Sequence, residues 1–281
     1  MNKQCLIKEL CAHYAGSDVV AAVRAALDGL EGAGRDLTPE DTAPFDEFHI
    51  RGREATAELA RRLDLKAGQR VLDVGCGIGG PSRYLAYAYG CQVTGLDLTE
   101  AYCEAARLIA GRLGLGGRLS YLQGDALSIP FPEGAFDAVW TQHAAMNIPD
   151  KGRLYGEIRR VLKPGGLLAV YDVLAGPGGT PYFPLPWARD PSMSFLIDAD
   201  EMGRCLTEAG LVVLSWRDTT ALGREWFRTL AAGKAADRGE GSGRAVPGLQ
   251  TLLGPELRTM SKNVMKNLEE DRIALVEIIA R

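Results

Sequence analysis

Several features that define large classes of protein are absent from this sequence. No apolar run in its 281 residues approaches the roughly 18 that a membrane-spanning helix requires. Charges interrupt the apolar stretch at residues 1–9, so we expect no cleaved secretion signal. The chain has 32 lysines and arginines and 36 aspartates and glutamates, which gives a net charge of −4. It therefore has no excess of positive charge to attract the phosphates of a nucleic acid. We expect a soluble, cytoplasmic protein that binds neither membranes nor nucleic acids.

Metal-ligating side chains are also scarce. There are three histidines, and none of the six cysteines belongs to a C-x-x-C pair or has a histidine at metal-ligand spacing. We therefore expect no metal site and interpret the cysteines as reduced thiols. Glycine, in contrast, is abundant, with 34 residues. Glycines gathered at turns indicate tight connections and at least one ligand site lined by backbone.

The chain divides into a helical part and an alternating α/β part. Residues 1–64 carry helical patterns at 19–27 and 53–63, joined by a polar connection at 29–44, and predict an N-terminal helical lid. In residues 65–281, helical patterns separate strands expected at 70–74, 91–97, 119–123, 136–140, 167–172, 211–216 and 273–279. This alternation predicts βαβ units and a largely parallel sheet covered on both faces. An irregular insertion is expected near 175–200, and residues 237–244 have the composition of a loop.

The connection after the first strand reads Asp-Val-Gly-Cys-Gly-Ile-Gly-Gly-Pro over residues 73–81. Its glycines at 75, 77 and 80 match G-x-G-x-x-G, a spacing that by itself does not identify the ligand. Asp73 narrows the choice, because a carboxylate at this place repels a pyrophosphate but attracts an ammonium group. A nicotinamide-dependent dehydrogenase is therefore disfavoured.

Two further carboxylates follow the next two strands. Asp97 can accept hydrogen bonds from both hydroxyls of a ribose. Asp125 can accept from an adenine amine, while Leu98 and Ala126 offer apolar faces to the ring. Three carboxylates along one edge of the sheet predict a cationic amino-acid nucleoside as the ligand.

Taken together, these motifs resemble those of the class I S-adenosylmethionine (SAM)-dependent methyltransferases. The resemblance covers about residues 48–217 and is carried by residues 71–79, 97, 124–126, 136–140 and 162–166. It implies a Rossmann-like seven-stranded sheet in the order 3-2-1-4-5-7-6, with the last strand antiparallel and helices on both faces. It also implies SAM as methyl donor, S-adenosylhomocysteine as product, and no metal.

The same resemblance assigns roles to individual residues. Gly75, Cys76 and Gly77 are implied to contact the methionyl part and the ribose through their backbone. Gln142, just past the fourth strand, is implied to contact the methionyl end. Asp97 would hold the ribose, and Asp125 with Ala126 the adenine.

Segments 48–56, 146–151 and 267–273 are most similar to the glycine, sarcosine and dimethylglycine N-methyltransferases, and the arrangement also resembles phosphoethanolamine N-methyltransferases. This similarity implies transfer to an amine nitrogen of a small molecule. Tyr14 has the position of a tyrosine in the lid of those relatives. Where the phosphoethanolamine group uses a histidine, this chain has Asn147, with His143 one turn earlier, so the phosphobase chemistry does not carry over directly.

The acceptor side has several candidate residues, each with a plain structural alternative. We interpret His143 as a general base or an acceptor-orienting group, the alternative being a histidine bonded to backbone at a helix start. Tyr14 and Asn147 are the other candidate catalytic residues. His49 and Trp187 are candidate substrate contacts that could equally be packing residues. Three arginines, 51, 53 and 189, could pair with an acceptor carboxylate.

Other functions remain open on the sequence alone. Transfer to oxygen, carbon or sulfur of a natural product or other small metabolite is the main alternative, and a SAM-binding module without transfer activity is another. The segment after the fourth strand, Thr-Gln-His at 141–143, is not the Asn-Pro-Pro-Tyr type that methylates nucleic acid amines. The oligomeric state is not indicated.

Overall fold

The structure is a computed structural model, and it describes residues 3–14, 18–31, 36–236 and 256–281. The loop expected at 237–244 lies outside these residues. Within them, no helix is both long enough and apolar enough to cross a membrane.

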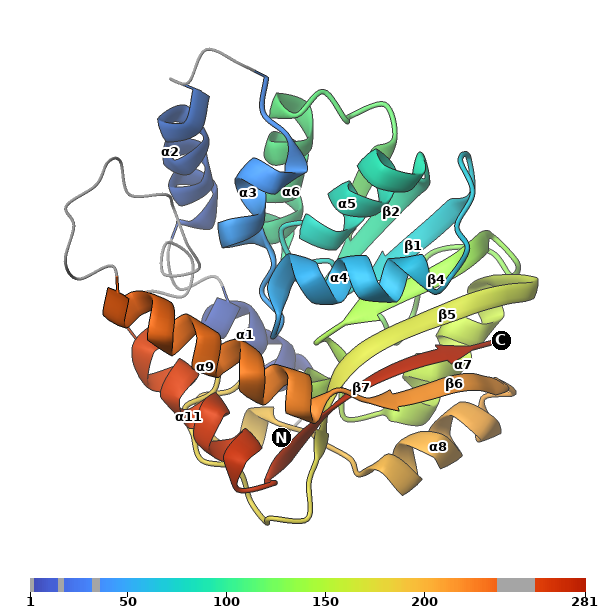
Figure 1. Cartoon of the computed structure of the whole chain (residues 1–281). Helices are drawn as coiled ribbons and strands as arrows, with labels where there is room; N and C mark the ends of the chain where they lie inside the picture. Colours follow the sequence, from blue (N-terminus) through green and yellow to red (C-terminus); the bar gives the residue numbers. More distant parts are fainter. Residues whose placement is uncertain (1–2, 15–17, 32–35, 237–255) are drawn as a thin grey trace.

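A seven-stranded sheet forms the centre of the molecule (Figure 1). Its strands run in the order β3-β2-β1-β4-β5-β7-β6. β7 is antiparallel to both of its neighbours and the remaining pairs are parallel, which confirms the expected topology. The bounds are β1 (Arg70–Val74), β2 (Gln92–Asp97), β3 (Leu119–Gln123), β4 (Phe136–Gln142), β5 (Leu162–Ala175), β6 (Val213–Asp218) and β7 (Ile273–Ala280).

Alternate side chains of the inner strands enter two different apolar clusters, one on each face of the sheet. Val71 and Trp140 point to the face covered by α4 (Gly52–Arg61), α5 (Gly80–Tyr89) and α6 (Glu100–Arg112). Leu72 and Val139 point to the face covered by α7 (Lys151–Val161) and α8 (Ala199–Glu208). Because both faces are buried, these strands read as continuous apolar runs in the sequence.

The N-terminal residues are more helical than the sequence suggested. Besides α1 (Lys3–Tyr14), helix α2 spans Val19–Glu31 and α3 spans Pro39–Asp46, so the polar connection expected at 29–44 is wrong for most of its described length. A capping box between Thr38 and Asp41 starts α3, and Pro39 occupies its first turn, where a missing N–H costs nothing. Phe45 then anchors α3 in a small core shared with α2 and α6.

Two helices near the C-terminus lie beside the carboxyl ends of the inner strands. α9 (Thr220–Ala236) follows β6, and α11 (Leu257–Glu269) precedes β7; the two lie side by side, with α1 close by (Figure 1). The segment after β5 is largely irregular and contains a short 3₁₀ turn, η2 (Pro191–Met193). These segments and the N-terminal helices surround the carboxyl ends of the inner strands.

Candidate functional site

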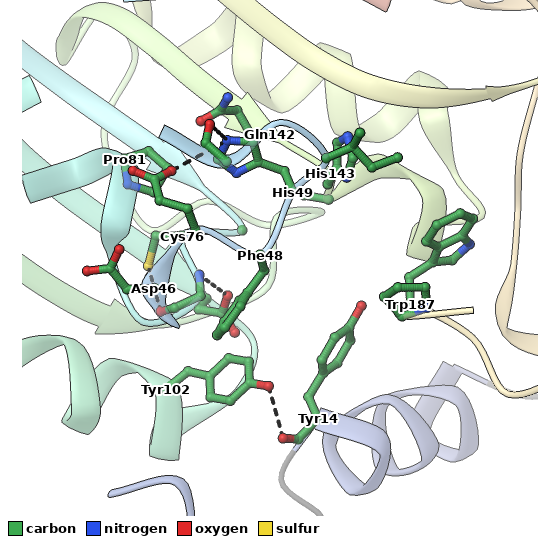
Figure 2. Close-up of a pocket in the computed structure, with 18 of the residues that line it drawn as sticks. Tyr14, Asp46, Phe48, His49, Cys76, Pro81, Tyr102, Gln142, His143 and Trp187 are labelled. Atoms are coloured by element: carbon green, nitrogen blue, oxygen red, sulfur yellow. Dashed lines mark hydrogen bonds and ion pairs between the residues drawn. The ribbon is translucent and has the colours of Figure 1, made fainter. Parts of the chain in front are cut away.

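A cavity of about 870 Å³ opens at the carboxyl ends of the inner strands. Fourteen residues that the sequence predicted for the site line this cavity, and Figure 2 shows several of them converging on it. They are Tyr14, His49, Asp73, Gly75, Cys76, Gly77, Asp97, Leu98, Asp125, Ala126, Gln142, His143, Asn147 and Trp187. Lining the cavity is a matter of position, so the role of each residue depends on its contacts.

The loop after β1 brings backbone to the cavity wall, and its geometry requires glycine. Gly75 and Gly77 have φ values of +75° and +52°, in the left-handed region. A Cβ on Gly75 would lie 2.4 Å from the Cβ of Ala144. The loop is fixed to β2 by the N–H of Gly75, which donates to the carbonyl of Leu96 over 2.8 Å.

Asp97 is held with both carboxylate oxygens in place at the end of β2. Oδ2 accepts from the N–H of Gly77 and Oδ1 from the N–H of Thr99, each over 2.9 Å. A carboxylate oxygen has two lone-pair directions, so each can accept one further hydrogen bond. This arrangement suits a pair of vicinal hydroxyls such as those of a ribose.

Asp73 is a buried carboxyl group at the end of β1, with 2% of its surface exposed. Its Oδ2 accepts a hydrogen bond from Ser82 over 2.5 Å. Burial, with weaker help from neighbouring carboxylates, raises the pKa of Asp73 to about 7. A cation bound beside it would favour the ionised form, so Asp73 fits the ammonium group of a methionyl moiety.

Gln142 presents an unused donor at the end of β4. Its Oε1 accepts from the indole N–H of Trp140 over 2.9 Å and lies 3.2 Å from the hydroxyl of Thr56. Its Nε2 is buried and finds no partner within the described ranges. Because an unsatisfied buried amide is costly, a ligand carboxylate is the natural partner for it. Gln142 and Asp73 together fit the two charges of an amino acid.

Asp125, Leu98 and Ala126 lie at the end of the cavity beyond β2 and β3. Oδ1 of Asp125 accepts from the N–H of Leu127 over 2.8 Å, which fixes the turn after β3. Leu98 and Ala126 contribute apolar surface to the cavity. The residues present therefore fit a nucleoside linked to an amino acid, as SAM is.

His143 has an unusual backbone conformation directly after β4. Its φ is +48°, in the left-handed region, and its N–H donates to the carbonyl of Tyr171 over 2.8 Å. Strain of this kind in a non-glycine residue is often found at functional sites. The imidazole stacks on Tyr171, with ring centroids 5.1 Å apart, and meets His49 edge-on at 5.9 Å.

The His143 ring is neutral at pH 7. Burial lowers its pKa well below 6.5, and the nearby His49 lowers it further. Its Nε2 is buried without a hydrogen-bond partner in the part of the chain that the structure describes. A neutral imidazole with one unused nitrogen can hold the reacting group of an acceptor by a hydrogen bond.

The geometry gives Asn147 a positioning role in place of the predicted catalytic one. Its Nδ2 donates to the carbonyls of Trp187 and Met193, over 2.8 and 3.0 Å. Its Oδ1 accepts from the hydroxyl of Tyr14 over 2.7 Å. Because both amide donors are engaged, Asn147 connects α1, the turn after β4 and the insertion.

Tyr14 and Trp187, the two residues that Asn147 binds, form part of the cavity wall. Burial raises the pKa of Tyr14, so its hydroxyl stays protonated. The indole N–H of Trp187 donates to Ser194 over 3.0 Å. Figure 2 shows both side chains across the cavity from the glycine loop.

The arginines expected to bind an acceptor carboxylate are engaged elsewhere. Arg51 pairs with Glu54 and Glu58 at 2.7 and 2.8 Å, and Arg53 pairs with Glu47 at 2.6 Å. Arg189 is exposed and is not among the residues that line the cavity. Within the described residues, Arg51 and Arg53 are therefore both paired with carboxylates, and the donor left over is the buried Nη1 of Arg53, which makes no hydrogen bond.

Sequence reasoning missed two sets of cavity residues. One is apolar and belongs to α9 and α11: Trp226, Phe227, Leu230, Leu257 and Val264. The adjacent aromatic pair at 226–227 was the available signal, although an amphipathic helix shows similar pairs. The other set belongs to the segment before α4, where Glu47 is buried and Phe48 lies against Gly77.

Comparisons with known proteins agree with this geometry. Residues 72–170 match the family model described as a methyltransferase domain. Over 116 residues the chain is 45% identical to a sterol 24-C-methyltransferase of Gibberella zeae, a match that covers 41% of this chain and 30% of the relative. The chain thus spans less than a third of that relative's length.

Two solved structures show how widely the fold is used. The [4+2]-cyclase SpnF is 29% identical with a TM-score of 0.63, and 81% of this chain matches 80% of that one. Phosphoethanolamine N-methyltransferase 2 of Haemonchus contortus, solved with phosphomonomethylethanolamine and S-adenosylhomocysteine, is 22% identical with a TM-score of 0.67, covering 83% of this chain and 53% of the other. The expected similarity to amine methyltransferases is thus seen in the fold, while the sequence relatives include C- and O-methyltransferases. Residues 72–170 are thus similar to methyltransferase domains, and about two fifths of the chain is similar to part of a sterol C-methyltransferase.

Proposed function

We propose that this protein transfers a methyl group from SAM to a small molecule whose bound part is bulky and mainly apolar. The observation that carries the proposal is the shape of the cavity. At about 870 Å³ it lies near the upper end of the roughly 300–1,000 Å³ usual for a ligand pocket, and it reaches beyond the nucleoside residues to α9 and α11. The wall there is mainly apolar: Trp226, Phe227, Leu230, Leu257 and Val264, with Ser261 as its polar member.

One half of the cavity holds the methyl donor. Bound SAM supplies a methyl group on a positively charged sulfur, which needs no further activation. In the proposal Asp73 and Gln142 hold the two charges of its amino-acid end, and Asp97 holds the ribose. The glycine loop brings backbone close enough to fix the donor in one orientation, which is the main requirement of an in-line transfer.

The polar end of the other half contains His49 and His143, whose ring centroids are 5.9 Å apart, and Tyr14 lines the cavity as well. We place the nucleophile of the acceptor there and its apolar body against α9 and α11. His143, neutral and with an unused Nε2, would orient the nucleophile. A nucleophile that bears a proton, such as a hydroxyl or an amine, best matches this end.

An amine acceptor, as the sequence suggested, fits this site best when it carries no carboxylate. A sarcosine-like acceptor carries a carboxylate, and Arg51 and Arg53 are already paired with glutamates. Removing a cation from a buried pair would leave the glutamate uncompensated. We therefore favour an apolar amine or hydroxyl compound over an amino acid as the acceptor.

The test is a competition between two pools of acceptors offered with isotopically labelled SAM. One pool contains bulky apolar phenols, alcohols and amines; the other contains glycine, sarcosine and dimethylglycine. We expect labelled products from the first pool by mass spectrometry, and slower transfer with Phe227→Ala, which removes apolar wall but no polar group. Label found only in the amino acids would refute the proposal.

A second function has one specific observation in its favour, since the structural relative at 29% identity is named a cyclase. Tight binding of S-adenosylhomocysteine with no transfer to either pool would favour a role in which the bound nucleoside is not a methyl donor.

A further inference from the structure

Two imidazoles face the acceptor end of the cavity, and their surroundings differ. Within the described residues, the hydrogen-bond and ion-pair contacts of His49 are all made by Nε2, which lies 2.8 Å from the carbonyl of Gly52, 3.1 Å from the hydroxyl of Thr56 and 3.4 Å from Oε2 of Glu47. A carbonyl can only accept, so Nε2 carries the proton and Nδ1 has the lone pair. His143 has no carboxylate among its contacts.

Thr56 connects His49 to a carboxylate. It lies on α4 and is fully buried. Its hydroxyl is 3.1 Å from Nε2 of His49 and donates to Oε2 of Glu47 over 2.8 Å. A hydroxyl both accepts and donates, so these two contacts form a hydrogen-bonded path from the imidazole to Glu47. The Nε2 proton is shared along it with the carbonyl of Gly52, and the Thr56 proton, which is nearer to Glu47, also lies 3.2 Å from Oε1 of Gln142.

Glu47 is suited to take up a proton at neutral pH. Its side chain is 1% exposed and lines the cavity, and its Oε1 is bound to Nε of Arg53 over 2.6 Å. Burial raises its pKa to about 7, against the lowering effects of Arg53 and Thr56. Burial lowers the pKa of His49 to about 4, so the imidazole can pass a proton on but does not retain it.

We propose that His49, Thr56 and Glu47 form a relay that removes the proton lost by the acceptor during methylation. The inference rests on the methyl transfer proposed above. As the bond from the nucleophile to the methyl carbon forms, the carbon–sulfur bond breaks and sulfur keeps its electron pair. The nucleophile's proton goes to Nδ1 of His49, and the proton on Nε2 passes through Thr56 to Glu47.

The charges around the relay set its pH dependence. The positive groups are Arg51 and Arg53 on the segment that contains α4 and Arg83 on α5, and the negative ones are Asp46 and Asp73; His143 is neutral. Asp46 is itself paired with Arg83 at 2.6 Å. Glu47 must be ionised to receive the proton, so the rate should rise with pH through about 7 and then level off.

Thr56 offers a matched pair of variants, because Thr56→Val removes only the hydroxyl and Thr56→Ser keeps it. With labelled SAM and the pool of apolar acceptors, we expect kcat to fall at least about tenfold in Thr56→Val and to recover in Thr56→Ser. Removing a general base costs about 10² to 10⁴ in rate, so Glu47→Gln should lose about 100-fold and the rise near pH 7. Affinity for S-adenosylhomocysteine should change less than threefold in the two Thr56 variants, because Trp140 holds Oε1 of Gln142 by the shorter hydrogen bond even when the Thr56 hydroxyl is lost.

A second measurement needs no acceptor. In the complex with S-adenosylhomocysteine, the histidine ¹⁵N signals should show His49 as the neutral Nε2–H tautomer and should sense a titration near pH 7 that disappears in Glu47→Gln. Equal kcat in wild type and Thr56→Val, or a Thr56→Ser variant as slow as Thr56→Val, would overturn the relay. If the wild type binds the nucleoside but transfers no methyl group, the proposed function fails, and the ¹⁵N titration alone decides whether the hydrogen-bonded path exists.

Discussion

Protonation of Asp73 should control how tightly the protein binds the amino-acid end of SAM. In the free protein its pKa is raised to about 7, mainly by burial. A bound ammonium group stabilises the ionised carboxylate and lowers this pKa, so binding releases a proton. Affinity for the ammonium group is therefore weak below pH 7, where Asp73 is protonated, and it rises as the pH passes through 7.

The size of the effect follows from the ionised fraction. With a pKa of about 7, roughly one Asp73 in eleven is ionised at pH 6 and about three in four at pH 7.5. Affinity for S-adenosylhomocysteine should therefore increase about eightfold over this range, which corresponds to about 1.2 kcal/mol. Higher pH is best avoided, because α-amino groups can begin to lose their proton at about 8.

Isothermal titration calorimetry with S-adenosylhomocysteine gives both the dissociation constant and, in buffers of different ionisation enthalpy, the number of protons released. Asp73→Asn should bind more weakly at pH 7.5 and show little dependence on pH. Glu47→Gln is the matched control, because Glu47 also lines the cavity and also has a pKa of about 7; it should keep most of the pH dependence. A wild-type affinity that is flat from pH 6 to 7.5, or a dependence that persists in Asp73→Asn, would show that Asp73 does not face the ammonium group.

Three further substitutions separate donor binding, transfer and loop geometry. Asp97→Ala should weaken S-adenosylhomocysteine binding by at least tenfold in the calorimeter, since it removes the ribose acceptor; unchanged affinity would refute that assignment. His143→Ala should lower kcat for the apolar pool by more than tenfold while leaving donor affinity within about threefold, and equal kcat would remove His143 from the reaction. Gly75→Ala should destabilise the fold by about 1–3 kcal/mol in urea unfolding, because of its φ of +75° and the 2.4 Å approach to Ala144; full stability would mean that the loop rearranges freely.

The donor half of the site could be predicted from the sequence because its residues are placed by local rules. Asp73 and Asp97 lie at the ends of β1 and β2 and Asp125 just after β3, and the carboxyl ends of such parallel strands share one edge of the sheet. The glycines at 75 and 77 are required by a turn of a few residues. Short-range backbone geometry therefore places the residues of the donor half, which is why they could be predicted from their positions along the chain.

The acceptor half was decided by contacts between distant segments. The sequence makes Asn147 a candidate catalytic residue. In the structure its amide is hydrogen-bonded to Tyr14, 133 residues earlier, and to the carbonyl of Trp187, contacts that suit a positioning role. In the sequence Arg51 and Arg53 are candidate partners of an acceptor carboxylate, whereas in the structure each forms an ion pair with a glutamate.

The sequence by itself determined the alternation of strands and helices, the glycine loop and the carboxylates of the donor site, because apolar runs, helical patterns and tight turns act over a few residues. The strand order was predicted through the resemblance to a known family and not from these local patterns. Only the tertiary structure decided which polar groups are already satisfied, how the relay from His49 to Glu47 is assembled, and that α9 and α11 supply an apolar wall. Burial and hydrogen-bond partners belong to the packed molecule, and no local pattern specifies them.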